Sequence, residues 1–266
     1  MNRIDIVFAA LRHRGRKALV PFITAGDPAL EATVAVMHAL VAAGADAIEL
    51  GVPFSDPMAD GPTIQRSSER ALARGVGTTR VLAMVRQFRE RDARTPVVLM
   101  GYLNPVLVRG WDAFAGAAVA AGVDGVLLVD LPPEEADAAR AIFTSHGLAL
   151  IALAAPTTSA ARLQRIAADA QGYLYYVSFA GVTGADRLDA AAVLDRVARL
   201  REKTTAPVVV GFGVRDGTSA RALAAGADGV VVGSALVEAI AGAADVDDAA
   251  CRAGAFLAPL RAALDG

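Results

Sequence analysis

The sequence predicts an α/β protein of the (β/α)₈ TIM-barrel class. A segment recurs three times, as AAGADAIELG at 42–51, AAGVDGVLLVD at 120–130 and AAGADGVVVG at 224–233. Each copy is typical of a helix that ends at a left-handed glycine, a turn with aspartate, and an apolar strand. The strand portions lack the apolar–polar alternation of a one-sided sheet, so helices should cover a parallel sheet. Eight such units in 266 residues fit the size of a barrel.

The eight predicted strands are the short apolar runs. They comprise residues 18–24, 47–50, 96–100, 125–129, 149–153, 173–177, 207–210 and 229–232. The predicted helices between them comprise 29–43, 79–92, 112–121, 134–145, 159–168, 190–203 and 218–225, with a further helical region from Ser234 onward. An open doubly wound sheet is the alternative, because periodicity does not reveal closure.

Two further helices are predicted outside the eight units. The first 17 residues, MNRIDIVFAALRHRGRK, have the spacing of an extra amphipathic N-terminal helix, and residues 63–74 form an added helix after the second strand. No linker or change in composition divides the chain. We therefore expect a single TIM-barrel domain over 1–266.

Composition narrows the classes of partner. The chain is 55% hydrophobic and 20% charged, has a net charge of -2, and contains no Lys/Arg block, so neither nucleic acid nor a membrane surface is an expected partner. The apolar runs are far shorter than the roughly 20 residues of a membrane-spanning helix. Cys251 is the single cysteine, and the N-terminus lacks the pattern of a signal peptide. We expect a cytoplasmic protein that acts on a small molecule.

Active sites of such barrels lie at the carboxyl ends of the strands. The second predicted strand ends in Ile48-Glu49-Leu50-Gly51, which places a carboxylate in an apolar run where ionisation is costly. Glu49 is therefore the first candidate catalytic residue, and a solvent-facing glutamate is the alternative. The loop that follows contains Asp56 and Asp60. Asp56 before proline is typical of a turn residue, whereas Asp60 is either a turn residue or a second proton-handling group opposite Glu49.

Glycines follow the last two predicted strands. Gly211-Phe212-Gly213 and Gly233-Ser234 stand where backbone N–H groups and a helix N-terminus suit a phosphate. The segment 178–186 contains glycines and is long enough to form a lid, with an inert surface loop as the alternative. His13, His38 and His146 have no metal-ligand spacing, so no metal is expected. No lysine stands at a strand end for a Schiff base, and no dinucleotide motif is present.

Six segments together resemble the tryptophan synthase α-subunit family, in order and over nearly the whole chain. They are PFITAGDP at 21–28, IELGVPFSDPMADGPTIQ at 48–65, GYLNP at 101–105, GVTG at 181–184, GFGV at 211–214 and GSAL at 233–236. The resemblance implies a carbon–carbon lyase of tryptophan biosynthesis that cleaves indole-3-glycerol phosphate to indole and glyceraldehyde 3-phosphate by an aldol-type reaction. Glu49 and Asp60 then correspond to the two catalytic carboxylates.

The resemblance also implies the substrate contacts. The implied phosphate contacts are Gly184, Gly213, Gly233 and Ser234, the implied indole pocket includes Phe22, Met100, Tyr175 and Phe212, and Thr183 is the implied lid residue that approaches Asp60. Ordinary barrel packing is the alternative role of the aromatic residues. Two positions depart from the family: Phe179 stands before GVTG, and Met100 stands where leucine is frequent.

The family's assembly implies a partner as well. The loops at 52–60 and 102–105 would contact a β subunit in an α₂β₂ heterotetramer; this chain would carry no cofactor, and pyridoxal phosphate would reside in the β subunit. Two other functions stay open from the residues alone. One is a different phosphate-binding barrel, such as an isomerase or a ring-closing synthase, and the other is a silent subunit that only activates its partner enzyme.

Overall fold

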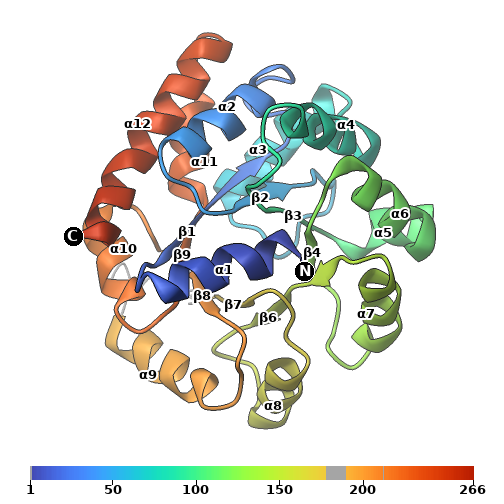
Figure 1. Cartoon of the computed structure of the whole chain (residues 1–266). Helices are drawn as coiled ribbons and strands as arrows, with labels where there is room; N and C mark the ends of the chain where they lie inside the picture. Colours follow the sequence, from blue (N-terminus) through green and yellow to red (C-terminus); the bar gives the residue numbers. More distant parts are fainter. Residues whose placement is uncertain (1, 178–189, 212) are drawn as a thin grey trace.

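The computed structural model describes residues 2–177, 190–211 and 213–266 (Figure 1). Within them, nine parallel strands form one sheet in the order β5-β4-β3-β2-β1-β9-β8-β7-β6. The strands are β1 (Ala18–Thr24), β2 (Ile48–Gly51), β3 (Val97–Gly101), β4 (Gly125–Leu128), β5 (Ala149–Leu150), β6 (Ala152–Ala154), β7 (Leu174–Val177), β8 (Val208–Gly211) and β9 (Gly229–Val232).

The two ends of this sheet belong to one stretch of chain. β5 pairs with β4 and β6 pairs with β7, and Ile151 alone separates β5 from β6. The predicted strand 149–153 is therefore two short strands, because the chain changes its pairing partner at Ile151. This exchange joins the ends of the sheet into a barrel, so the predicted (β/α)₈ class is confirmed and the open doubly wound sheet was wrong.

Helices surround the sheet on its outer side, except the first helix, which lies across one end of the barrel (Figure 1). They are α1 (Arg3–His13), α2 (Ala32–Ala42), α3 (Pro62–Ala73), α4 (Thr78–Arg89), α5 (Leu103–Arg109), α6 (Trp111–Ala121), α7 (Ala136–Ser145), α8 (Ala160–Ala168), α9 (Ala190–Arg201), α10 (Gly217–Ala224), α11 (Ser234–Ala241) and α12 (Val246–Asp265). Both extra helices predicted from the sequence are present, as α1 and α3. No helix of the described residues has the length and apolar character needed to cross a membrane.

Two helical features differ from the sequence prediction. α5 occupies a segment predicted as a loop; Pro105 is tolerated there because it lies in the first turn, where no N–H needs an acceptor within the helix. The region after Ser234 contains two helices, because the Asp245 side chain caps the N-terminus of α12 and starts a new helix. The apolar periodicity reports neither the Asp245 cap nor the short helix α5.

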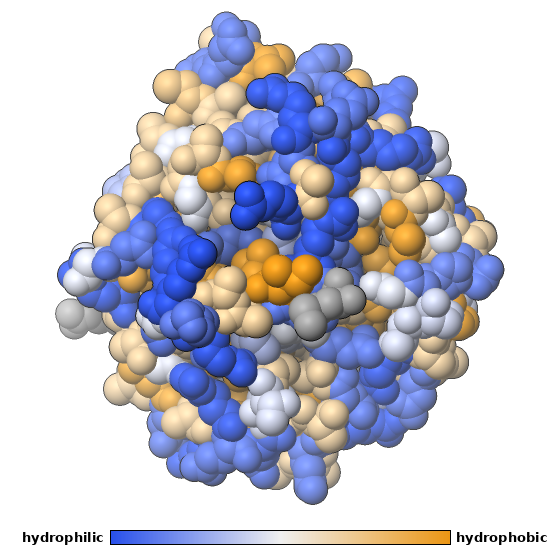
Figure 2. Space-filling model, viewed as in Figure 1, coloured by the Kyte–Doolittle hydropathy of each residue, from blue (hydrophilic) through white to orange (hydrophobic). Residues whose placement is uncertain are grey.

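Side chains alternate between two cores along every strand. The outward-facing cluster packs the sheet against the helices and includes Leu19, Leu99 and Val210. The inward-facing cluster fills the barrel and includes Val20, Val98 and Val209, together with Ile4, Phe8 and Leu11 of α1. α1 thus closes the amino end of the barrel, which faces the viewer in Figure 1. The surface of this end is largely hydrophilic, apart from small apolar areas (Figure 2). The continuity of both clusters supports the proposal that residues 1–266 form a single domain.

The aspartates of the threefold repeat fasten the amino ends of neighbouring strands. Asp46, Asp124 and Asp228 each accept a hydrogen bond of 2.9 Å from a backbone N–H of an adjacent strand, namely that of Leu19, Val97 and Val208 respectively. Each also forms an ion pair, with Arg261 at 3.0 Å, Arg89 at 2.8 Å and Arg201 at 3.3 Å respectively. In each of its three copies, the repeat therefore fixes neighbouring strands by the same two contacts, a hydrogen bond to a strand N–H and an ion pair with an arginine.

The glycines of the repeat are less uniform than predicted. Gly44 and Gly122 have φ of 100° and 91°, as expected for left-handed positions after a helix. Gly226 is not among the glycines with positive φ. A Cβ at Gly226 would lie 2.8 Å from Leu194, so this glycine allows the close approach of α9.

Replacing Asp124 with alanine should strongly destabilise the protein. Asp124 is 3% exposed and pairs with Arg89 and Arg3, so its loss leaves a half-buried Arg89 without its counter-charge. We expect the free energy of unfolding, measured by urea denaturation, to fall by about 3–5 kcal/mol. Asp137→Ala is the control, because its ion pairs with Arg140 and Arg165 are exposed and should contribute nothing measurable. Equal losses in the two variants would contradict this account.

Candidate active site

Glu49 lies inside the barrel on β2. Strand register places it beside Phe22 of β1 and Val98 of β3, both of which face the interior. Its side chain is completely buried. The alternative of a solvent-facing glutamate was therefore wrong, because barrel closure places this strand position in the inner layer.

The two carboxyl oxygens of Glu49 have different surroundings. Oε1 accepts a hydrogen bond of 2.6 Å from the Tyr173 hydroxyl, whereas Oε2 has no hydrogen-bond partner among the described residues. Burial raises the pKa of Glu49 to about 7, and the hydrogen bond from Tyr173 opposes this rise. A carboxyl group with this pKa can both donate and accept a proton near neutral pH.

Two glycines make room for the aromatic rings around Glu49. A Cβ at Gly211 would lie 1.9 Å from the hydroxyl oxygen of Tyr175, and a Cβ at Gly51 would lie 2.6 Å from the ring of Phe22. Tyr175 and Phe22 belong to the inner cluster and are 7% and 6% exposed. Any larger residue at these glycines would displace the rings from the barrel.

Asp60 lies in the loop between β2 and α3. Its backbone N–H bonds the carbonyl oxygen of Pro57 at 3.0 Å, and its own carbonyl oxygen accepts a bond of 2.9 Å from Gln65. Pro62 starts α3 after Gly61, one residue before the predicted start at Thr63, because proline suits the first position of a helix. Burial raises the pKa of Asp60 to about 6, and a hydrogen bond from Tyr102 lowers it. By contrast, Asp56 is an exposed turn residue, as predicted.

Asp60 lines a hollow at the barrel mouth together with two of the predicted pocket residues, Phe22 and Met100. The hollow is also lined by Thr24, Gly51, Val52, Ile64, Ser68, Gly101, Tyr102 and Val129. Tyr102 was not among the predicted site residues. Its place directly after the third strand, where a barrel places functional side chains, is the signal that could have identified it.

Polar contacts attach α3 to β1 beside the hollow. The hydroxyl groups of Thr24 and Ser67 are hydrogen-bonded at 2.6 Å, and Arg70 binds both carboxylate oxygens of Asp27 at 2.7 and 2.8 Å. Asp27 is 1% exposed. Since α3 begins two residues after Asp60, these contacts hold the Asp60 loop near the barrel mouth.

The predicted phosphate contacts lie at the last two strands. Gly213 follows β8 with φ of 81°, and Gly233 and Ser234 form the start of α11. The N-cap position of α11 is Gly233, which has no side chain, whereas Asp216 caps α10 with its carboxylate. A Cβ at Gly233 would lie 3.6 Å from Phe22, so the N-terminus of α11 lies beside a residue that lines the hollow.

Three predicted site residues lie outside the described residues. They are Thr183, Gly184 and Phe212, and the whole segment predicted as a lid, 178–186, lies there as well. The structure therefore brings together Glu49 with Phe22 and Tyr175 in the interior, and Asp60 with Phe22 and Met100 at the mouth.

Comparisons with known proteins agree with this geometry. Residues 8–262 match the family model described as "Tryptophan synthase alpha chain". A tryptophan synthase alpha chain of Xanthomonas oryzae pv. oryzae is 71% identical over 266 residues, which covers 100% of this chain and 99% of the relative.

Solved structures show the same similarity. The crystal structure of tryptophan synthase subunit alpha from Legionella pneumophila has a TM-score of 0.93 and 49% identity, covering 100% of this chain and 99% of that chain. A chain of tryptophan synthase from M. tuberculosis, in its aminoacrylate-bound form, has a TM-score of 0.88 and 38% identity, covering 99% of this chain and 100% of that chain. With a matching family model, relatives alike over their whole length and the same barrel, this chain belongs to the tryptophan synthase alpha chain family, whose members are lyases of tryptophan biosynthesis.

Proposed function

We propose that this chain cleaves indole-3-glycerol phosphate to indole and glyceraldehyde 3-phosphate by acid–base catalysis with Glu49 and Asp60. The observation that carries the proposal is a fully buried glutamate inside the barrel, whose pKa burial raises to about 7, and a half-buried aspartate at the barrel mouth, with Phe22 beside both. Two carboxyl groups in different environments are suited to two different proton-handling tasks.

Glu49 is the proposed general acid and base. Cleavage of the bond between indole C3 and the side chain needs a proton on C3 and removal of the proton from the adjacent hydroxyl group. Protonated Glu49 donates the first proton and, as carboxylate, accepts the second, so the group returns to its starting state. Tyr173 binds Oε1 and thereby orients the carboxyl group, which leaves Oε2 for the substrate.

Asp60 is the proposed stabiliser of the developing charge. Protonation of C3 places positive charge on the indole nitrogen, and an ionised Asp60 that accepts the N–H hydrogen bond stabilises this charge most in the transition state. Its loop at the barrel mouth supports the role, since the apolar rings of Phe22 and Met100 line the same hollow. Tyr175 and Phe212 complete the proposed indole pocket.

The substrate phosphate is the proposed anchor at the other end. The N–H groups of Gly213, Gly233 and Ser234, with that of Gly184, are the proposed contacts. The uncapped N-terminus of α11 supports this placement because helix N-termini attract anions. An anchored phosphate orients the scissile bond between the carboxyl groups. Thr183 is the proposed lid contact of Asp60. Proton transfers suffice for this reaction, so we propose no cofactor in this chain.

A β subunit is the proposed partner, in an α₂β₂ assembly in the cytoplasm, with pyridoxal phosphate in the β subunit. Exposed apolar side chains support docking at the segments after β2 and β3: Met58 of the loop after β2 is 85% exposed, and Val108 and Leu107 of α5 are 82% and 49% exposed. A protein partner that covers such side chains removes apolar surface from water.

Glu49→Gln and Asp60→Asn should each abolish most of the cleavage. A positioned proton donor contributes about 10²–10⁴-fold to a rate, and glutamine can neither donate nor accept the required proton. The measurement is indole release from indole-3-glycerol phosphate, with and without a β subunit. We expect low activity of the wild type alone and stimulation by the partner.

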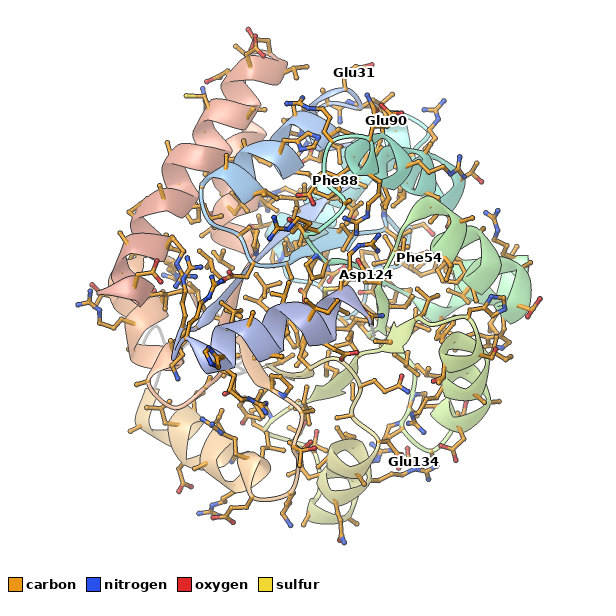
Figure 3. All side chains as sticks on the ribbon, in the orientation of Figure 1. Glu31, Phe54, Phe88, Glu90, Asp124 and Glu134 are labelled. Atoms are coloured by element: carbon orange, nitrogen blue, oxygen red, sulfur yellow. The ribbon has the colours of Figure 1, made fainter. Side chains whose placement is uncertain are left out.

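Exposed residues provide matched controls for this assay. Glu90→Gln and Asp247→Asn make the same chemical changes at the surface and should retain full activity; Glu90 is labelled at the edge of the molecule in Figure 3. Full turnover by Glu49→Gln would overturn the mechanism. A silent subunit would instead release no indole while accelerating the partner enzyme.

Glu49→Gln should also change how stability depends on pH. Because burial raises the pKa of Glu49 from its ordinary 4.5 to about 7, the wild type loses stability as pH rises from about 4.5 to 7 and no further above that. The variant avoids this loss. Relative to wild type, it should gain up to about 3 kcal/mol between pH 5 and pH 8 in urea unfolding. If the free energies of unfolding of the variant and the wild type differed by the same amount at pH 5 and pH 8, the pKa of Glu49 would not be raised.

Val108→Asp should weaken the stimulation by the β subunit. A charge on this exposed valine of α5 would have to be desolvated in the proposed interface. We expect the β-subunit concentration for half-maximal stimulation to rise about tenfold or more, with unstimulated cleavage unchanged. Val119→Asp, at a 41% exposed valine of α6, is the control and should leave the stimulation intact. If both variants were stimulated like wild type, α5 would lie outside the interface.

A further inference from the structure

Tyr102 lies between two loops at the barrel mouth. It is the N-cap residue of α5, directly after β3, and is 5% exposed. Its ring stacks on that of Phe54, with centroids 5.1 Å apart and an angle of 27° between the planes. Phe54 belongs to the loop after β2, the loop that carries Asp60, and its side chain is labelled in Figure 3. The stacked rings therefore connect this loop to the end of β3.

The Tyr102 hydroxyl group makes two contacts with the Asp60 loop. Its oxygen accepts a hydrogen bond of 3.0 Å from the backbone N–H of Ala59. The Tyr102 side chain also lines the same hollow as Asp60, and a side-chain hydrogen bond between the two residues lowers the pKa of Asp60. A tyrosine hydroxyl can accept and donate at the same time, so one atom holds both the backbone and the side chain of this segment.

The other charged and titratable groups near Asp60 offer it no comparable support. Tyr175 faces Asp60 from β7, and Asp130 faces Tyr102 from the end of β4, where it accepts a bond of 2.8 Å from the Leu103 N–H. Burial holds the pKa of Tyr175 well above its ordinary value, so Tyr175 is neutral where Asp60 titrates, and a second carboxyl group such as that of Asp130 gives no support to an ionised Asp60. Among the described side chains, Tyr102 is thus the one whose contact lowers the pKa of Asp60.

We propose that Tyr102 is a positioning residue for the lyase reaction, which orients Asp60 towards the indole pocket and keeps it ionised. This inference rests on the proposed role of Asp60 and assigns the residue that makes the role possible in a water-poor site. Without Tyr102, burial alone would act on the carboxyl group, and a protonated Asp60 cannot accept the indole N–H hydrogen bond.

Tyr102→Phe tests the proposal, because it removes the hydroxyl group and keeps the ring that stacks on Phe54. The first measurement is the pH dependence of kcat/KM for cleavage of indole-3-glycerol phosphate. The acidic limb should move to higher pH, with kcat/KM about tenfold below wild type at pH 6 and a smaller loss at pH 8. Ionisation of the substrate phosphate is the same for both proteins, so the shift between them reports on the enzyme.

The second measurement is a carboxyl NMR titration of Asp60 in the free protein. We expect a higher pKa of Asp60 in Tyr102→Phe than in wild type. Tyr176→Phe is the control, since this buried tyrosine faces the helices rather than the barrel mouth and its loss should change neither the profile nor the titration. Phe54→Leu keeps the Tyr102 hydroxyl group but removes the ring that stacks on it. This variant should shift the pH profile and the pKa of Asp60 in the same direction as Tyr102→Phe, by smaller amounts. It replaces Tyr102→Phe if that variant does not fold.

The outcomes distinguish a failure of the role assigned to Tyr102 from a failure of the proposed function. An unchanged acidic limb together with an unchanged Asp60 titration would overturn the assignment of Tyr102, whatever the loss of thermal stability. Full activity of Asp60→Asn would instead overturn the proposed function, while the titration would still report whether Tyr102 controls the ionisation of Asp60.

Discussion

Closure of the barrel is the constraint on which the rest of the structure depends. The strand at 149–154 pairs with β4 through its first half and with β7 through its second, and this exchange turns a row of strands into a ring. Closure gives every strand an inner face, and Glu49 occurs where the pattern calls for an inward side chain. Water is thereby removed from one carboxyl group, whose pKa rises to about 7. The chemistry proposed for this chain begins with that desolvation.

The carboxyl groups at the two ends of the barrel have different partners. At the amino end, Asp46, Asp124 and Asp228 are each paired with an arginine and bonded to a strand N–H, which fastens the strands. At the carboxyl end, the described contacts of Glu49 and Asp60 are to tyrosine hydroxyl groups. A neutral donor orients a carboxyl group and lowers its pKa less than an arginine would, so Glu49 can still exchange a proton while Asp60 is kept ionised. The strand-fastening contacts and the proposed chemistry thus lie at opposite ends, as is usual for this fold.

The site depends equally on the elements that restrict its loops. α3 is attached to β1 through Thr24–Ser67 and Asp27–Arg70, and Tyr102 attaches the segment that precedes α3 to the end of β3. Asp60 lies between these two attachments, on a loop without regular secondary structure. Glycines contribute in a different way: Gly51 and Gly211 leave the space that Phe22 and Tyr175 occupy beside Glu49. Rigid neighbours on both sides give a loop residue the precision that catalysis requires.

The sequence by itself determined an α/β chain of eight strand–helix units, both extra helices, the placement of Glu49 in the second strand and the glycines after the last two strands, because apolar runs, helix periodicity and turn chemistry are local properties. It could not decide whether the sheet closes, where the strand at 149–154 changes partners, or that α5 is a helix. It also left Asp60 between a turn residue and a site residue. Only the tertiary structure brought Asp60 beside Phe22 and Met100 and revealed Tyr102, because these residues meet across separate loops through contacts that no periodicity encodes.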